Sequence, residues 1–265
     1  MAARSARTAI LVSDRGSLKA FAVRWKNPRL WKTGLFCGLA LFAASSFQQI
    51  GLLHTEPGKA GFLTAMYIVM VPILGLFLKK IPPVSTVFSV ILAVAGLYLL
   101  SCTGASGINI GDILLLFGAL GFATQIVLID RWGQGLDSLR LNCIQCLVCC
   151  VLSTPLMVME KPVLSDVLNA WMPSAYAGVL SMGVSYSLQI VGQRHLDSTS
   201  ASLIMSLESV IAVLSGWVVL HQMLTFSELC GCALVFCAVI LSQIPFGKKI
   251  SLPHPHAEKT EALSK

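Results

Sequence analysis

Charged residues are scarce in this 265-residue chain, and long stretches of it contain none. Asp, Glu, Lys and Arg together make up 12% of the residues, against about a quarter in soluble globular domains. A soluble protein of this length could not cover its surface with so few charges. With 55% apolar residues, the composition excludes an ordinary soluble domain and indicates a membrane protein.

Signatures of enzymes and of nucleotide-driven pumps are also missing. The sequence contains no GxxxxGKS/T phosphate loop, no HExxH zinc motif and no GxSxG nucleophile turn. Four of the nine cysteines lie on one predicted helix, where packing is the expected role because a zinc site draws its ligands from separate elements. We therefore expect no catalytic residue, no metal and no cofactor. An intramembrane enzyme is the alternative, which an assay with lipid substrates would test.

The net charge of +7 does not indicate nucleic-acid binding. The basic residues collect before the first apolar stretch and after the last one, and no basic patch is interleaved with stacking aromatics. The lipid bilayer is therefore the expected partner, and nucleic acid is not.

Eight apolar stretches have about the length of a helix that crosses a bilayer. A hydrocarbon core of about 30 Å requires ~20 helical residues, and charged side chains inside it are expensive. The predicted spans are roughly 33–53, 60–78, 84–102, 111–130, 140–159, 171–193, 199–220 and 226–244. The predicted fold class is therefore all-α, a polytopic membrane bundle of eight transmembrane helices.

Positive charge alternates between the two sides of these spans. Of the 19 Lys and Arg residues, only Lys59 and Lys161 fall in loops on one side, and the other seventeen fall on the opposite side. Because cytoplasmic loops carry the excess of Lys and Arg, both termini are predicted to be cytoplasmic. The apolar piece at 9–13 is too short for a signal peptide. Residues 1–32 are thus interpreted as a basic cytoplasmic segment and residues 245–265 as a polar cytoplasmic tail.

A weak internal repeat appears when residues 48–101 are shifted by 141 positions. Nine of the 54 pairs are identical, among them Gln48 with Gln189 and His54 with His195. The matching spans would cross the membrane in opposite directions. Inverted repeats of this kind are typical of secondary transporters.

Four stretches make the chain resemble the drug/metabolite transporter superfamily, of the EamA-domain type. They are 58–72 (GKAGFLTAMYIVMVP), 82–101, 111–131 (GDILLLFGALGFATQIVLIDR) and 201–217 (ASLIMSLESVIAVLSGW). The resemblance implies two inverted five-helix repeats and localisation in the bacterial plasma membrane. One departure is Leu207-Glu208-Ser209, where the family commonly has Leu-Glu-Pro. The other is the start of the chain, where residues 1–32 stand in place of the first two helices.

The repeats therefore differ in size. Residues 33–102 form a partial first repeat of three helices, and residues 111–244 form a second repeat of five. Without its first helix pair, the central cavity would lack a wall. The alternative to an active transporter is thus a truncated, transport-incompetent or accessory membrane protein of the same family, or one that works only as a homo-oligomer.

Glu208 is the only acidic residue well inside a predicted span. A carboxylate there is costly unless it is protonated, paired or facing water, so a functional role is the default hypothesis. It could couple transport to protons, contact a cationic substrate or form a hydrogen bond that supports a broken helix.

Neutral polar residues in the spans complete the expected substrate cavity. Gln48 and Gln189 are related by the repeat, as are Tyr67 and Glu208. The candidate cavity residues are Gln48, Gln49, Tyr67, Gln125, Tyr186, Gln189 and Glu208. Each amide could instead link helices, and each phenol could pack in the core. The set favours a small metabolite or drug-like solute and disfavours a multiply anionic one.

Other small and charged residues are assigned to structure. Gly34 and Gly38 form a GxxxG pattern typical of a close helix contact. Asp112 and Asp130 lie at the two ends of the 111–130 span, and Asp130 is expected to pair with the adjacent Arg131.

Overall fold

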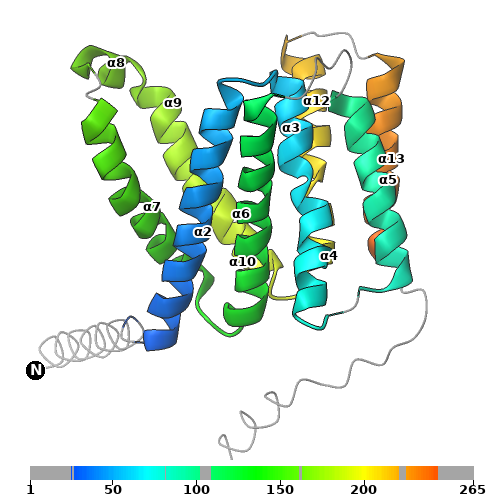
Figure 1. Ribbon diagram of the computed structural model, residues 1–265, viewed down its shortest axis with the longest axis horizontal. Coiled ribbons are helices and arrows are strands. Elements are labelled where there is room, and N and C mark those ends of the chain that lie inside the picture. Colours follow the sequence, from blue (N-terminus) through cyan, green and yellow to red (C-terminus); the bar gives the residue numbers. More distant parts are fainter. Residues whose placement is uncertain are drawn as a thin grey trace, which may run out of the picture.

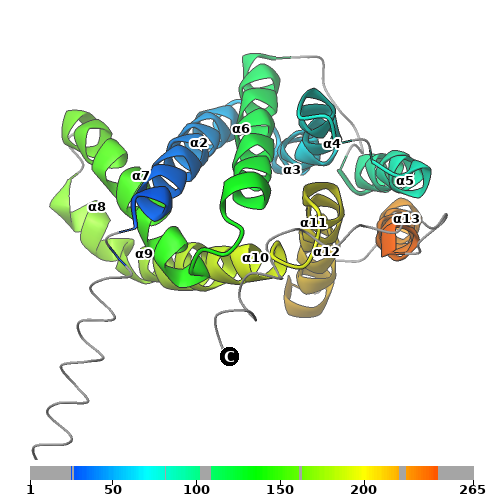
Figure 2. The ribbon, with the colours of Figure 1, turned by 90° about the horizontal axis from the view of Figure 1, so that it is seen from below.

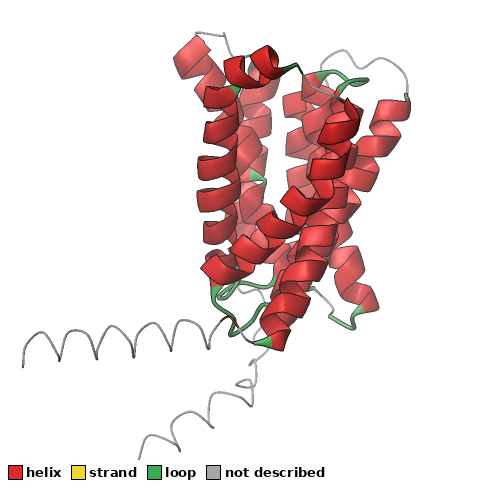
Figure 3. Cartoon of the chain, turned by 90° about the vertical axis from the view of Figure 1, so that its left-hand side faces the viewer, coloured by secondary structure: helices red, strands yellow, loops and turns green. Residues whose placement is uncertain are grey.

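A computed structural model of the chain describes residue 25 and residues 27–80, 82–101, 109–160, 163–220 and 225–243. Within these ranges every regular element is a helix and no strand occurs (Figure 3). The basic segment expected at 1–32 lies mostly outside the described residues. The polar tail expected at 245–265 lies wholly outside them.

The long helices run roughly side by side along one axis (Figure 1). In chain order the elements are α2 (Pro28–Leu52), α3 (Pro57–Ala65), α4 (Tyr67–Phe77), α5 (Val84–Ser101), α6 (Ile110–Trp132), α7 (Ser138–Glu160), α8 (Leu164–Asn169), α9 (Trp171–Tyr176), the π-helix η1 (Ala177–Ser185), α10 (Tyr186–Gly192), α11 (Ser198–Met205), α12 (Leu207–Leu220) and α13 (Phe226–Gln243).

Six described stretches are long and apolar enough to cross a membrane. They are Pro28–Leu52, Lys59–Phe77, Ile110–Trp132, Ser138–Glu160, Ser198–Ser215 and Phe226–Gln243. Of the other two predicted spans, one coincides with the shorter apolar helix Val84–Leu100, and the other is divided among α9, η1 and α10. The all-helical class with several membrane spans is confirmed, whereas the count of eight stays a prediction.

Helix α2 begins five residues before its predicted span. Asn27 occupies the N-cap, and its side chain accepts a hydrogen bond from the backbone N–H of Arg29. Pro28 follows at the first helical position, which suits its fixed φ and its missing N–H. The helix therefore extends beyond the apolar core into residues that bear charge.

Two spans are broken at corresponding places. The α3–α4 helix is interrupted at Met66 and the α11–α12 helix at Ser206, 140 residues later. The N-caps of α3 and α11, Glu56 and Asp197, are 141 residues apart, which is the offset of the sequence repeat. The helix bounds thus follow the same period as the weak sequence identities.

The second break forms without a proline, since none occurs between Ser198 and Leu220. The side-chain hydroxyl of Ser202 donates to the carbonyl of Thr199, and that of Ser206 donates to the carbonyl of Leu203. Such bonds compete with the helical main-chain ladder. The buried serines of α11 therefore give a physical reason for the break before Glu208.

Close helix contacts hold the bundle together, and several depend on glycine. α2 lies along α6 and α7, while α5 lies along α13 (Figure 2). A Cβ added at Gly38 would lie 2.6 Å from Cβ of Val148 on α7, and one at Gly34 would meet Ile144. The predicted role of the GxxxG pattern in packing is confirmed. Gly96 of α5 and Gly231 of α13 approach each other in the same way.

Candidate functional site

Glu208 and Tyr67 occupy equivalent places in the two broken helices. Tyr67 is the first residue of α4, directly after the break at Met66. Glu208 is the second residue of α12, two positions after the break at Ser206. The two breaks thus place one phenol and one carboxylate at the start of the second half of each helix.

These two side chains lie within electrostatic range of a third from another element. The carboxylate of Glu208 acts electrostatically on the phenols of both Tyr67 and Tyr186, the first residue of α10. Tyr67 is buried, Tyr186 is half-buried and Glu208 is exposed. Three of the seven predicted site residues, from α4, α10 and α12, therefore form one group.

This group has unused bonding capacity. Within the described part of the chain, the side chains of Tyr67, Tyr186 and Glu208 form no hydrogen bond or ion pair. An ionised carboxylate accepts hydrogen bonds, and each phenol can donate or accept one. The group can therefore take up a proton or bind an ammonium or amide group, which would satisfy a carboxylate that is costly at membrane depth.

Gln125 and Gln189 belong to a chain of amides that crosses the bundle beside this group. Gln189 of α10 donates to Gln125 of α6 at 3.3 Å, and Gln125 donates to Gln145 of α7 at 3.2 Å. Gln145 in turn donates to Asn142 at 2.7 Å. Gln125 and Gln145 are both fully buried. This chain links three helices, and it shares α10 with Tyr186.

Asn142 ends this chain at the π-helix. Its amide nitrogen donates to the carbonyls of Met182 and Gly183 and to the hydroxyl of Ser187, all at 2.9–3.0 Å. Where a π-helix returns to α-helical spacing, one carbonyl is passed over by the main-chain donors. Asn142 donates hydrogen bonds to the carbonyls at that transition and so stabilises the helical turn that precedes Tyr186.

The side chains of Gln48 and Gln49, both on α2, form no hydrogen bond within the described part of the chain. Gln48 is half-buried, and its backbone faces Gly118 of α6. Gln49 lines a cavity of about 550 Å³. That cavity lies between α2, α7 and η1 and is lined by Phe42, Ser45, Ser46, Gln49, Ile50, Cys149, Ser153, Leu156, Met159, Glu160 and Met182.

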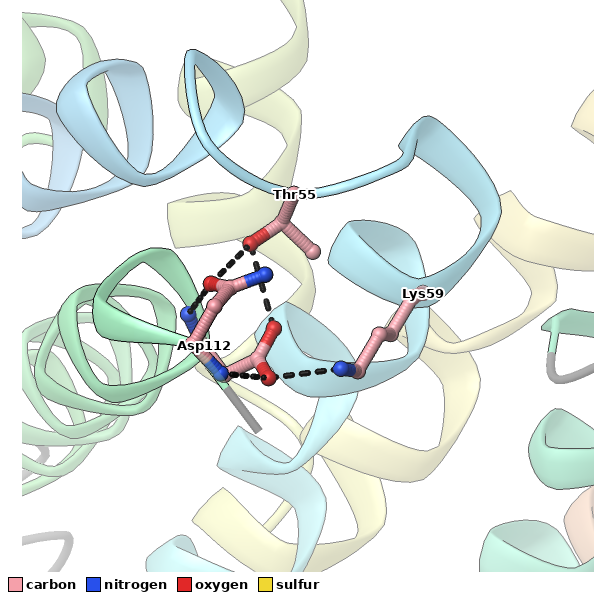
Figure 4. A network of polar contacts seen from close by, with 4 residues as sticks. Thr55, Lys59 and Asp112 are labelled. Carbon is pink, nitrogen blue, oxygen red and sulfur yellow. Dashed lines mark hydrogen bonds and ion pairs between the residues drawn. The ribbon is translucent and has the colours of Figure 1, made fainter. Parts of the chain in front are cut away.

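The two ends of α6 are fixed by lysines of the α3–α4 side. Asp112 pairs with Lys59 at 2.6 Å and lies within hydrogen-bond distance of the Thr55 hydroxyl (Figure 4). At the other end, Asp130 pairs with Lys80 at 2.6 Å. The expected pair of Asp130 with Arg131 is therefore wrong, because Lys80 approaches from the loop that follows α4.

Two functional features escaped sequence reasoning. The π-helix has no signature in residue pattern, since its nine residues are as apolar as an ordinary span. Asn142 could have been noticed as a further amide inside a predicted span. Its role depends on the carbonyls it meets, and these belong to residues 40 and 41 positions away.

Comparisons with known proteins match this chain to a transporter family and to proteins named as transporters. The sequence model of the EamA-like transporter family matches residues 109–243. An uncharacterized transporter of Archaeoglobus fulgidus is 34% identical over 212 residues, which make up 80% of this chain and 68% of the relative. The uncharacterized transporter YcxC of Bacillus subtilis is 22% identical over 81% of this chain and 73% of its own length.

A solved crystal structure has the same fold. It superposes with a TM-score of 0.67 over 89% of this chain and 94% of its own chain, at 17% sequence identity. At that identity the likeness concerns the fold alone.

Proposed function

This chain belongs to the EamA-like transporter family and is an integral membrane transporter; from that premise we propose that it is a secondary transporter that exports or exchanges a small metabolite or drug-like solute. The observation that carries the proposal is Glu208, an exposed carboxylate within electrostatic range of two phenols of other helices. A group of this kind can bind a solute or a proton in turn.

The proposed substrates are neutral or cationic solutes such as amines and amino acids. The proposed cavity residues comprise one carboxylate, two phenols and neutral amides, and none of them is basic. A multiply anionic solute would meet no compensating charge there, and it would be repelled by Glu208.

The proposed mechanism is alternating access between two unequal repeats, residues 33–102 and 111–244. Breaks at Met66 and Ser206 divide one helix of each repeat near the phenol group. Broken helices at the repeat interface are where secondary transporters of this type bind their substrates. Rocking of one repeat against the other would expose Glu208 to each side in turn.

We also propose eight membrane spans in the plasma membrane, with both termini cytoplasmic. The support is the distribution of Lys and Arg between alternate loops. Reporter fusions after residue 107 and at the C-terminus test this topology. The proposal requires an external reporter at the first position and a cytoplasmic one at the second.

The role of Glu208 is tested by uptake into vesicles that contain the purified protein. The probe is a mixture of isotope-labelled amino acids and aliphatic amines, offered across an imposed pH gradient. We expect Glu208→Gln to abolish gradient-driven accumulation, because the neutral amide cannot exchange a proton or pair with a cation. Solute exchange without a gradient would then no longer depend on pH.

A matched control is Glu228→Gln. Glu228 is a half-buried carboxylate that lies in the first turn of α13, as Glu208 lies in the first turn of α12, but it accepts hydrogen bonds from the backbone N–H and hydroxyl of Thr225. We expect this variant to accumulate solute like the wild type. Unchanged accumulation and an unchanged pH profile in Glu208→Gln would remove the coupling role.

A second candidate is an accessory or transport-incompetent membrane protein. One observation favours it: the residues from Trp171 to Gly192 include a single buried one, Ile190. Such a span has room for a partner helix, or for a second copy in a homo-oligomer. Vesicles that transport only after a partner protein is added would support this alternative.

A further inference from the structure

A polar pocket of about 570 Å³ opens at the end of the bundle where α2 begins and α6 ends. It is lined by Asn27, Leu30, Gln134, Gly135, Leu136, Asp137, Arg140 and Arg194. These residues come from the start of α2, the α6–α7 loop, the first turn of α7 and the turn after α10. The pocket therefore lies between spans at one surface of the membrane, away from Glu208.

The pocket carries an excess of positive charge. Two arginines, Arg140 and Arg194, line it, and Asp137 is its only acidic lining residue. A third arginine, Arg29, lies at its edge and donates to the carbonyls of Trp132 and Gln134 at 3.3 Å. One carboxylate cannot neutralise three guanidinium groups, so the pocket attracts anions.

The arginines are held in place by their surroundings. Arg194 donates to the carbonyl of Leu136 through one terminal nitrogen. Arg140 lies over the ring of Trp25, 5.8 Å from its centroid, and 3.8 Å from Asp137. Because a guanidinium has five N–H donors, Arg194 retains several after this bond. Two fixed guanidinium groups on one pocket form a suitable site for phosphate oxygens.

Apolar side chains beside the pocket indicate that the phosphate belongs to a lipid. Leu139, next to Arg140, is 63% exposed, and Trp31 on α2 is 45% exposed. Val191, three residues before Arg194, is also exposed. Acyl chains would cover these side chains, whereas a soluble phosphate would leave them uncovered. Basic pockets between membrane helices are known to bind anionic headgroups.

We propose that this pocket binds the phosphate of an anionic lipid headgroup, held by Arg140 and Arg194. Lipid binding at this pocket does not require transport activity. A protein that binds no lipid here could still transport, and a protein that transports nothing could still bind lipid. The simplest competing role of the two arginines is to fix the α6–α7 loop.

The test is native mass spectrometry of the full chain released from detergent. The protein is incubated with phosphatidylglycerol or with phosphatidylcholine of the same acyl chains. We expect the wild type to retain phosphatidylglycerol preferentially. Each basic residue near an anionic headgroup contributes on the order of fivefold in affinity, so Arg140→Gln/Arg194→Gln should bind phosphatidylglycerol roughly 25-fold more weakly.

Two variants separate recognition from folding. Arg131→Gln removes an exposed arginine near the same end that does not line the pocket, and it should keep the lipid preference. Arg194→Lys keeps the charge and should retain most of the binding. Equal retention of the two lipids by the wild type would overturn the proposal, as would unchanged binding in the double variant. Displacement of phosphatidylglycerol by millimolar inorganic phosphate would overturn the assignment to lipid.

Discussion

Two helical stretches related by the 141-residue offset, α2 and residues 171–192, have very different surroundings. α2 is a regular helix with eight buried residues, and it packs along both α6 and α7. The stretch 171–192 passes through the π-helix η1, has Ile190 as its one buried residue and meets chiefly α7. Large apolar side chains along it are exposed, such as Trp171 at 63% and Leu188 at 64%.

The difference teaches what α6 and α7 contribute to the fold. They cover α2 on two sides, and for the repeat-related stretch no corresponding helix pair exists among the described residues. The bilayer can cover the exposed apolar side chains of 171–192, but it cannot satisfy polar backbone groups. Asn142 of α7 supplies two such hydrogen bonds at the π-helix, to the carbonyls of Met182 and Gly183, and Ser187 donates a further one to Gly183.

The same contrast holds for the two broken helices. The α3–α4 helix is joined to α6 by ion pairs at both ends, through Lys59 and Lys80. Ser200, 141 residues after Lys59, carries no charge, and α11–α12 has no ion pair among the described residues. The helix that carries Glu208 is therefore the less restrained of the two, which suits a moving part.

The largest expected effect comes from disrupting the close contact between α2 and α7. Gly38→Leu would force a side chain against Cβ of Val148 and a backbone carbonyl of α7, and we expect a loss of about 3 kcal/mol in the free energy of unfolding. Val179 is the matched position, 141 residues later, and is 63% exposed. Val179→Leu should leave thermal unfolding in detergent nearly unchanged. Equal destabilisation by both variants would contradict the claim that neighbouring helices cover α2 more closely than residues 171–192.

Removal of Asn142 should have a smaller and more local effect. Asn142→Leu removes the amide that donates to the carbonyls of Met182 and Gly183, and we expect it to cost about 2 kcal/mol. Hydrogen exchange should increase in residues 177–187 and stay unchanged in α2. Cys143→Leu, at the adjacent exposed position, is the control. Faster exchange in both variants would show that Asn142 has no special role.

The smallest expected effects concern the ends of α6. Lys59 is 14% exposed and its partner Asp112 is 6% exposed, so Lys59→Met should destabilise the protein by about 1.5 kcal/mol. Lys80 is 52% exposed, and water screens its pair with Asp130, so Lys80→Met should cost less than about 1 kcal/mol. Chemical unfolding of both variants, measured at low and high salt, would compare the contributions of the two ion pairs to stability. A larger loss in Lys80→Met would contradict this order.

Much of the fold could be predicted because the bilayer imposes simple rules on sequence. The predicted spans are stretches with almost no charged residues. The observed helices begin and end within a few residues of these spans, apart from the start of α2 at Pro28. The repeat offset anticipated that Tyr67 and Glu208 occupy equivalent places. Gly34 and Gly38 indicated a close contact because small residues allow helices to approach.

What could not be predicted depends on contacts between distant residues. Asp130 has a basic neighbour in sequence, Arg131, yet its partner is Lys80, since helix packing decides which charge comes near. The break at Ser206 arises from hydroxyl groups and not from a proline, and residue type alone did not reveal it. The chain of amides was foreseen only as alternatives, substrate contact or helix linkage. Bonds between Gln125, Gln145 and Gln189 show the linkage.

The central claim is that this chain, with 171–192 uncovered, transports a solute without a partner protein. The most direct test is accumulation of the labelled amino acid and amine mixture by vesicles that contain only the purified chain. We expect at least one solute to accumulate against its concentration gradient when a pH gradient is imposed, and to be released when a protonophore collapses it. Folded, monodisperse protein that accumulates none of the solutes would contradict the account and favour the accessory role.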